Sequence, residues 1–272
     1  MKLTQNESVF FVGVVHSGTE EQLTELLNSI ARQDRETLRI ETVVFYKTKP
    51  ASAPGHVKAQ QYSNEQELFD GLLGAMENSN AAYHTLLSSK ECFYEGVFEA
   101  IDHIFKDYPE INWLTGIQTL QAQKGFNVIT GNTACRRWNF DIYEKSLYKS
   151  TIRYIPPGST FWRKAAWQKA LPHLYFVSEQ SLFADVWRAL FKTQKLYTSN
   201  IYISSVANTP TPISEENILQ YELIEDSWLD RITEFFFVNN LPVLRSIYKN
   251  REKLTPVVRF DHKKMSYYLY EY

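Results

Sequence analysis

Short apolar runs alternate with helical stripes through the N-terminal part of this chain, and no other feature restricts its fold as strongly. Val9–Val15, Ile40–Tyr46 and Tyr83–Leu87 are rich in β-branched, aromatic and other apolar residues and have the length of buried strands. A helical pattern follows each of them. Strands that alternate with helices in this way predict an α/β fold, with a mixed but mostly parallel, Rossmann-like sheet flanked by helices.

The helical patterns carry their own start and stop signals. Thr19–Gln22 has the spacing of a capping box and precedes an apolar stripe, and Ser63–Gln66 repeats that spacing. A third stripe begins at Val97 and stops before Pro109. Ligands of open α/β sheets lie beyond the carboxyl ends of the strands. We therefore expect the functional site in the loops that follow the three predicted strands.

The second half of the chain is less regular. Residues 111–154 are rich in Thr, Gln and Asn, so we expect sheet edge and loops there. A helix is predicted over 180–192 with a strand after it, and most of 214–248 has helical periodicity. This organisation predicts a main domain over 1–208 and a helical C-terminal extension over 209–272 that packs on it.

Composition narrows the class of protein. With 272 residues, 44% of them apolar, the chain can bury a full core. Its 29 Lys and Arg nearly balance 31 Asp and Glu, which leaves no basic field for a nucleic acid partner. Cys92 and Cys135 suit a reducing compartment, and the apolar run near the N-terminus is too short to span a membrane. We expect a cytoplasmic protein with at most peripheral membrane contact, through Phe235–Phe237.

Several common site motifs are missing from the sequence. It contains no Gly-x-Gly-x-x-Gly, no Walker loop, no Gly-x-Ser-x-Gly elbow, no His-Glu-x-x-His and no Cys-x-x-Cys. The six histidines fall in no helical ligand spacing, so we expect hydrogen-bonded or solvated side chains. His16 is the exception, because it follows the first strand and lies in a loop where a ligand would bind.

Two stretches beyond residue 154 resemble one family. Ile155–Trp167 reads Ile-Pro-Pro-Gly-Ser-Thr-Phe-Trp-Arg-Lys-Ala-Ala-Trp and is similar to the acceptor-side signature of bacterial family-2 glycosyltransferases. Asp185–Arg188 resembles the Asp-Leu-Trp-x-Arg pattern that follows it in that family. The resemblance implies a GT-A fold, a nucleotide-sugar donor and a glycan or polysaccharide acceptor. It places these residues at the acceptor: Ser159, Thr160, Trp162, Arg163, Trp187 and Arg188.

On the donor side, the resemblance is incomplete. Tyr46 stands where the family has an aspartate that holds the nucleoside, so stacking on a base would have to substitute for that contact. Asp70, in Phe69-Asp70-Gly71, is either a surviving nucleotide-side carboxylate or a solvated or capping acid. His16, Tyr46 and Asp70 are our candidate nucleotide-sugar contacts from this part of the chain.

The third predicted strand ends in the wrong residues for a metal site. The family has a pair of aspartates here that hold a divalent cation, whereas this chain has Ser88-Ser89-Lys90-Glu91. A lysine cannot bind Mg²⁺ or Mn²⁺, and Glu91 alone makes a poor site. Either the Lys90 ammonium neutralises the donor diphosphate directly, or Lys90 and Glu91 are a plain surface pair. The first alternative makes Ser89, Lys90 and Glu91 donor-binding residues without a metal cofactor.

The position of the catalytic base is also changed. The family carries a carboxylate two residues before the aspartate of its Asp-x-Trp pattern, and this chain has Phe183 there. General base catalysis contributes roughly 10²- to 10⁴-fold to a rate, so another acid would be needed. Asp185 and Glu179 are the nearest candidates, although Asp185 lies about 200° around the helix from Phe183 and could instead pair with Arg188. Gly158 replaces a further acid of the signature.

These departures leave two hypotheses. In the first, the protein is a working glycosyltransferase with a non-standard, metal-independent site that serves glycan assembly. In the second, it is a catalytically inactive member that keeps the fold to bind a glycan, a nucleotide, a partner glycosyltransferase or a second copy of itself. Binding of nucleotide-sugars and exposed apolar surface are the observations that separate them.

Overall fold

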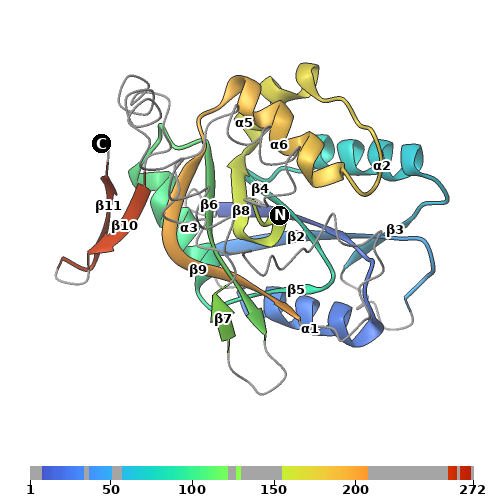
Figure 1. Cartoon of the computed structure of the whole chain (residues 1–272), viewed down its shortest axis with the longest axis horizontal. Helices are drawn as coiled ribbons and strands as arrows, with labels where there is room; N and C mark the ends of the chain where they lie inside the picture. The colour runs from blue at the N-terminus through green and yellow to red at the C-terminus, as the bar shows by residue number, and fades with distance from the viewer. Residues whose placement is uncertain are drawn as a thin grey trace, which may run out of the picture.

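The computed structural model describes residues 8–33, 37–50, 57–121, 127–129, 155–207, 257–261 and 264–270. They form an 11-stranded sheet with helices on both faces (Figure 1). The strands are β1 (Ser8–Val15), β2 (Leu38–Tyr46), β3 (Lys58–Gln61), β4 (Tyr83–Ser88), β5 (Glu91–Phe93), β6 (Trp113–Gln121), β7 (Asn127–Ile129), β8 (Thr160–Arg163), β9 (Tyr197–Ala207), β10 (Val257–Asp261) and β11 (Ser266–Tyr270). The helices are α1 (Glu20–Ala31), α2 (Glu65–Asn78), α3 (Val97–Asp107), α5 (Lys164–Ala170) and α6 (Leu182–Thr193), with short 3₁₀ turns η2 (Pro157–Ser159) and η3 (Leu171–His173).

The strand order confirms the predicted α/β fold. It runs β11-β10-β9-β6-β8-β4-β1-β2-β3, with β5 paired to β9 and β7 to β6. The four strands β4, β1, β2 and β3 are parallel to one another, and β4 is antiparallel to its other neighbour, β8. The three predicted N-terminal strands correspond to β1, β2 and β4. The sequence of β3 is Lys-Ala-Gln-Gln and all four residues are exposed, so it had no apolar signal.

The region expected to form sheet edge and loops contains an interior strand. β6 lies between β8 and β9, antiparallel to the first and parallel to the second. Its polar residues obscured this position, because Thr115, Gln118 and Thr119 are buried and hydrogen-bonded within the protein. The edge prediction is therefore wrong for residues 113–121, while residues 130–154 lie outside the described part.

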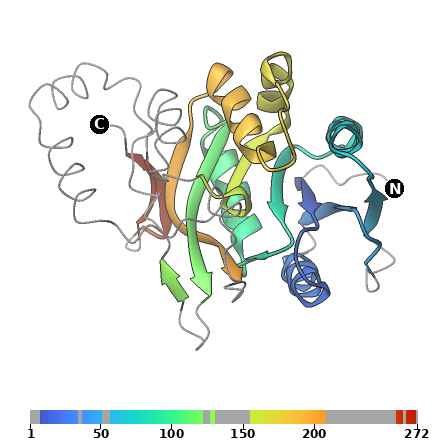
Figure 2. The same cartoon turned by 45° about the vertical axis from the view of Figure 1, so that its right-hand side comes forward.

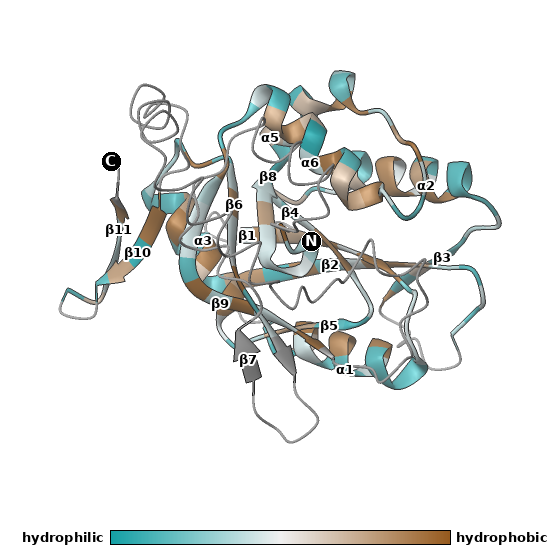
Figure 3. Cartoon of the chain, in the orientation of Figure 1, coloured by the Kyte–Doolittle hydropathy of each residue, from teal (hydrophilic) through white to brown (hydrophobic). Residues whose placement is uncertain are grey.

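The two faces of the sheet have separate apolar cores. One core joins β-strand side chains to α2, α5 and α6, and the other joins them to α1 and α3. Figure 2 shows α1 and α2 on opposite sides of β1, β2 and β3. Hydrophobic colour gathers on the strands and on the inward helix surfaces, and hydrophilic colour on the outer surfaces (Figure 3). The core of the α5–α6 face is built around Trp113, Trp162, Trp167 and Trp187, each at most 1% exposed.

Helix starts agree with the predicted capping pattern, with one shift. Thr19 caps α1 in a complete capping box with Gln22. At α2 the cap is Asn64, one residue after the predicted Ser63, and its side chain accepts from the Glu67 backbone N–H. Asn is as good a cap as Ser, and here the Asn64 side chain also donates to Glu67, which fixes the later start.

The described part of the C-terminal region is strand rather than helix. β10 pairs in parallel with β9, and β11 pairs antiparallel with β10. The predicted helix over 214–248 and Phe235–Phe237 lie outside the described residues. The aromatic tail packs as expected at Tyr267, whose carbonyl accepts a hydrogen bond of 2.7 Å from the Tyr108 hydroxyl on the α3 side. Among the described residues, none of the helices has the length and apolar character to cross a membrane.

Candidate functional site

The carboxyl ends of β4, β1 and β2 meet at one edge of the sheet. Parallel pairing aligns Val15 with Phe45 of β2 and with Ser88 of β4. The backbone extends this alignment past the strands, because His16 N–H donates to Phe45 O at 2.8 Å and Ser89 N–H donates to Val15 O at 3.1 Å. His16 and Ser89 therefore lie together at the edge where α/β sheets bind ligands. We call this the β1–β4 edge.

Ser89 closes the N-terminal end of α1. Its hydroxyl oxygen accepts from the backbone N–H groups of Gly18 at 3.0 Å and Ser17 at 3.2 Å, and it lies 3.0 Å from His16 Nδ1. Ser89 is fully buried. Because two N–H groups occupy its lone pairs, the hydroxyl proton points to Nδ1. This hydrogen-bond pattern assigns the proton of a neutral His16 ring to Nε2.

Lys90 lies beside the same loop. A Cβ added to Gly18 would lie 3.2 Å from Lys90 Cγ, so the lysine stem lies against the loop that leads into α1. Its backbone N–H donates to Ser88 Oγ at 3.1 Å and holds the turn after β4. No described carboxylate pairs with the Lys90 ammonium. Thr19 and Gln22 satisfy each other at the helix start, and Lys90 adds a positively charged side chain beside it.

Glu91 turns into the protein. It is 2% exposed, and its Oε2 accepts from Ser88 N–H at 2.8 Å. Its Oε1 accepts from Gly158 N–H at 2.9 Å and from Gln118 Nε2 at 2.5 Å. Burial raises the pKa of Glu91 to about 7, against the opposing effect of these donors. The alternative of a surface Lys–Glu pair is therefore wrong, because β5 begins at Glu91 and pairs with β9, which directs the side chain inward.

The described residues at this edge do not fit a divalent cation. Mg²⁺ and Mn²⁺ need several oxygen ligands, whereas both Glu91 oxygens are engaged inside the protein and the neighbouring residue is a cation. Nor do the described residues contain any group of three or more His, Cys, Asp or Glu placed to hold a metal. A metal ion has no part in the mechanism proposed for these residues.

Glu179 lies at the ends of β2 and β3. Its Oε2 is 2.6 Å from Lys47 Nζ, and its Oε1 accepts from the Tyr62 hydroxyl at 3.0 Å. The segment that carries it, Leu174–Ser181, crosses to α2, where Phe176 stacks on Phe69 with centroids 4.7 Å apart. The structure thus places this predicted base candidate at the carboxyl ends of β2 and β3, and its role as a base stays a prediction.

The structure gives little support to two further residues that were predicted to contact the donor. Tyr46 ends β2 with 8% of its surface exposed, and its carbonyl accepts from Tyr62 N–H at 3.0 Å. Asp70 is exposed on α2 and accepts a hydrogen bond of 2.9 Å from Gln66 of the same helix. Stacking by Tyr46 and a nucleotide contact by Asp70 stay predictions, and Asp70 has the surroundings of a solvated acid.

Asp185 is engaged within the protein on all sides. Its Oδ2 accepts from Val177 N–H at 3.0 Å and from Ser181 Oγ at 2.6 Å, and its Oδ1 accepts from Arg188 at 3.0 Å. The residue is 2% exposed. The predicted pairing with Arg188 is confirmed. Phe183, at the position of the family's base, packs at the border of the tryptophan core.

The other residues of the acceptor-side signature serve the core. Trp162 and Trp187 pack on each other with centroids 5.6 Å apart. Ser159 and Thr160 are fully buried and hydrogen-bonded to β9 and β6 partners. Arg163 donates to the carbonyls of Ile111 and Phe105, and so caps the end of α3. In this structure the side chains of these residues face protein. Their contacts with an acceptor stay predictions.

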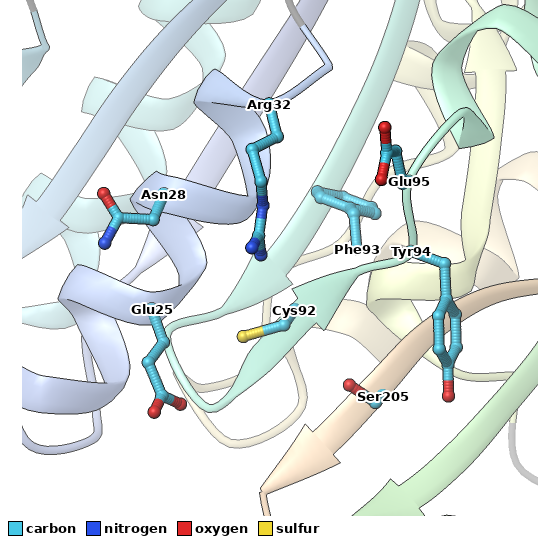
Figure 4. A pocket seen from close by; sticks show the side chains of 8 residues that line it. All are labelled: Glu25, Asn28, Arg32, Cys92, Phe93, Tyr94, Glu95 and Ser205. Carbon is cyan, nitrogen blue, oxygen red and sulfur yellow. The ribbon is translucent and has the colours of Figure 1, made fainter.

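A pocket of about 490 Å³ lies beside β5, and none of its lining residues is a predicted site residue (Figure 4). Its lining comes from α1, β5 with the two residues after it, and β9: Glu25, Asn28, Arg32, Cys92, Phe93, Tyr94, Glu95 and Ser205. Burial and the nearby carboxylates of Glu25 and Glu91 raise the pKa of the Cys92 thiol to about 12. Cys92 is therefore a neutral, free thiol in a pocket of mixed charge.

Sequence reasoning missed four residues that shape these sites. Gln118 of β6 links Glu91 to Ser204 of β9, because its Nε2 donates to Glu91 Oε1 and to Ser204 Oγ. Lys47 and Tyr62 hold Glu179. Lys47 and Tyr62 each come directly after a strand, and this position could have marked them as site residues. For Tyr62 the strand is β3, whose polar sequence had to be recognised first.

Comparison with known proteins supports the fold. No protein-family model matches the sequence, and no curated protein matches it. The chain is similar to the crystal structure of S. aureus TarS 1-349 in complex with UDP-GlcNAc, with a TM-score of 0.51 and 12% identity over 78% of this chain and 61% of that one. A second structure of TarS 1-349 gives a TM-score of 0.49 and 13% identity over 72% and 60%. The chain thus spans about three fifths of those TarS chains. The likeness to the UDP-GlcNAc complex supports a GT-A fold for this chain.

Proposed function

We propose that this protein binds a nucleotide-sugar along the carboxyl edge of β4, β1 and β2 and transfers the sugar to a glycan or polysaccharide acceptor. The observation that carries the proposal is the meeting of His16, Ser89 and Lys90 at that edge. The fold adds support, because the TarS structure of the same fold holds UDP-GlcNAc. We take UDP-GlcNAc as the first donor to test.

Lys90 has the central role in this proposal. Its ammonium neutralises part of the diphosphate charge, as a point charge in place of a dication. The Nε2–H of His16 supplies a second donor to the phosphate oxygens. Binding then needs no metal ion, and its affinity depends on ionic strength because the lysine is partly exposed.

The transfer step forms a bond from an acceptor oxygen to the anomeric carbon. It breaks the bond from that carbon to the diphosphate, which leaves with the electron pair. The acceptor proton must pass to a base, and Phe183 cannot accept it. Among the predicted bases, Asp185 is engaged by three donors and Glu179 is paired with Lys47.

This shortage of free carboxylates favours a second candidate function. In it the protein binds the nucleotide-sugar or a glycan without transfer and acts as a scaffold for a partner glycosyltransferase or a second copy of itself. Tyr175 and Val177 support it, because they are 79% and 60% exposed on the segment that also holds Glu179. Contiguous exposed apolar surface is typical of protein-binding sites, and these two residues are the ones that such a partner would contact.

The test is a thermal shift with UDP-GlcNAc, with and without Mn²⁺. A ligand at 100 times its Kd stabilises the native state by about 2.7 kcal/mol, so Tm should rise without the metal. Lys90→Met should abolish the rise, whereas Lys58→Met, an exposed lysine on β3, should leave it intact. No shift at millimolar UDP-GlcNAc or GDP-sugars would refute the proposal. UDP release with time then separates a transferase from a scaffold.

A further inference from the structure

One buried carboxylate joins the turn after β4 to the stretch that resembles the acceptor-side signature. Glu91 Oε2 accepts from the Ser88 backbone N–H at 2.8 Å, so the last residue of the turn is bonded to its first. Glu91 Oε1 accepts from the Gly158 N–H in η2 and from Gln118 of β6. The carboxylate therefore fixes the turn to two distant parts of the chain. We call Ser88–Glu91 the β4–β5 turn.

The β4–β5 turn carries the residues that we place at the donor diphosphate. Ser89 accepts backbone N–H groups of the loop before α1 and lies 3.0 Å from His16 Nδ1. Lys90 is held by its own N–H, which donates to Ser88 Oγ at 3.1 Å. Glu91 is 2% exposed and both of its oxygens accept from groups inside the protein, so it does not reach a ligand at the β1–β4 edge. Any effect of Glu91 on binding must pass through the position of Ser89 and Lys90.

The ionised form of Glu91 suits these contacts better than the neutral acid. A carboxylate has about four lone-pair sites and no proton, and three of the sites are used here. Oε1 already receives two donors, so a proton on the acid must go to Oε2. There it turns a charge-assisted bond from Ser88 N–H into a weaker bond to a hydroxyl oxygen. Protonation thus weakens the contact that closes the β4–β5 turn.

The groups bonded to Glu91 are neutral. They are the backbone N–H groups of Ser88 and Gly158 and the amide of Gln118, which continues to Ser204 of β9. Burial raises the pKa of Glu91 to about 7, and the hydrogen bonds from these three groups oppose the rise. The bonding arrangement of Glu91 can therefore change near neutral pH.

The charged and titratable residues near Glu91 lie on its outer side. The stem of Lys90 lies against the loop at Gly18. Cys92 follows in β5, and burial raises the pKa of its thiol to about 12, so it stays neutral. Glu25 and Arg32 of α1 face Cys92 across the pocket of Figure 4. Among the described residues, none of these side chains contributes to the shift in the pKa of Glu91.

We propose that Glu91 is a positioning residue for the donor diphosphate, because its ionised carboxylate holds the β4–β5 turn, with Ser89 and Lys90, in the conformation that binds the phosphates. This inference rests on the proposed function, since it needs a nucleotide-sugar at the β1–β4 edge. It gives Glu91 a part in binding without contact with the ligand. Nucleotide-sugar binding then becomes tighter as Glu91 loses its proton.

The experiment is calorimetric titration of wild type and Glu91→Gln with UDP-GlcNAc at pH 6 and pH 8. Both phosphates of this ligand are esterified, so its charge is constant over the range. A group with a pKa of about 7 is roughly one tenth ionised at pH 6 and nine tenths at pH 8. The ratio of the wild-type affinity to that of Glu91→Gln should therefore rise by about five- to tenfold. His16 is present in both proteins, so any effect of its protonation cancels in the ratio.

Glu95→Gln, an exposed acid just after β5, is the matched control and should bind as wild type does at both pH values. A carboxylate that only stabilised the fold would leave the ratio of wild type to Glu91→Gln constant. A constant ratio would therefore overturn the positioning role while nucleotide binding stands. If wild type binds no UDP-GlcNAc at either pH, both proposals fail.

Gln118→Leu keeps the test valid if Glu91→Gln does not fold. It removes a hydrogen bond that lowers the pKa of Glu91, and leaves the carboxylate in place. The curve of affinity against pH for Gln118→Leu should therefore lie at higher pH than that of wild type. Identical curves would overturn the proposal. Circular dichroism of each variant verifies the fold.

Discussion

The carboxylate of Glu91 fills the space that a side chain at position 158 would need. A Cβ added to Gly158 would lie 2.8 Å from Glu91 Oε1 and 3.0 Å from its Cδ. The same oxygen accepts the Gly158 N–H at 2.9 Å. Residues from β5 and η2 thus depend on each other, although 67 positions separate them in sequence. The family signature that this stretch resembles has a glutamate at position 158. In this protein the buried carboxylate of Glu91 lies next to that position.

Gly158→Ala should destabilise the protein by about 2 kcal/mol, because overpacking a buried site typically costs 1–3 kcal/mol. The matched control is Gly74→Ala in α2, where a Cβ meets open space and helix propensity favours alanine. Urea unfolding of both variants measures the difference. Glu91→Ala with Gly158→Ala should be less destabilising than the sum of the single changes. Strict additivity would show that the two positions are independent.

Glu91 should make stability depend on pH. Its pKa is about 7 in the folded protein against a usual 4.5, so the folded state binds its proton more tightly than the unfolded state. Its contribution to the free energy of unfolding is therefore highest below pH 4.5 and falls by roughly 3 kcal/mol as pH rises through 7. The measurement is urea unfolding of wild type and Glu91→Gln from pH 4 to 8. A difference between them that does not change with pH would contradict this assignment.

The parts of the fold visible in sequence are those with a local pattern. β1, β2 and β4 are continuous apolar runs, and the Thr19 capping box identified the start of α1 within one residue. β3 was not predicted because an exposed edge strand of polar residues has no apolar period. β6 was assigned to an edge because its buried polar residues resemble those of an exposed strand.

The site was less predictable because its contacts are long-range. Lys90 and Glu91 are adjacent in sequence, yet one lies at the helix end and the other is buried against Gly158 and Gln118. The pairing of β5 with β9 directs Glu91 inward, and no local sequence pattern predicts that pairing. Arg163 was expected at the acceptor from the family resemblance, whereas its guanidinium donates to carbonyls near the end of α3. The residues of this signature-like stretch therefore serve packing in the described structure.

His84 should act on stability in the opposite direction to Glu91. It is fully buried between the rings of Phe11 and Trp162, and burial, with the Lys164 ammonium, lowers its pKa to about 3. Below pH 6.5 the unfolded state binds a proton that the folded state rejects, so stability falls as pH decreases, by up to about 5 kcal/mol at pH 3.

The variant His84→Leu removes this titration. Its free energy of unfolding should fall less than that of wild type between pH 6.5 and 4. His173→Leu, at an exposed position in η3, should follow the wild-type curve. Thermal unfolding at a series of pH values provides the comparison. Parallel curves for wild type and His84→Leu would mean that the imidazole does not titrate between the two states.

Asp185→Asn should reduce stability and leave nucleotide binding unchanged. The carboxylate accepts from Val177, Ser181 and Arg188, and an amide would turn a donor toward one of these donors. Hydrogen bonds to charged groups contribute about 1.5–3 kcal/mol each, so we expect a loss of at least 2 kcal/mol. Urea unfolding measures the loss, and titration with UDP-GlcNAc measures binding. The control is Asp70→Asn, at an exposed position of α2, which should change stability by less than about 0.5 kcal/mol. An Asp185→Asn protein as stable as wild type that nevertheless loses sugar transfer would assign this carboxylate to catalysis.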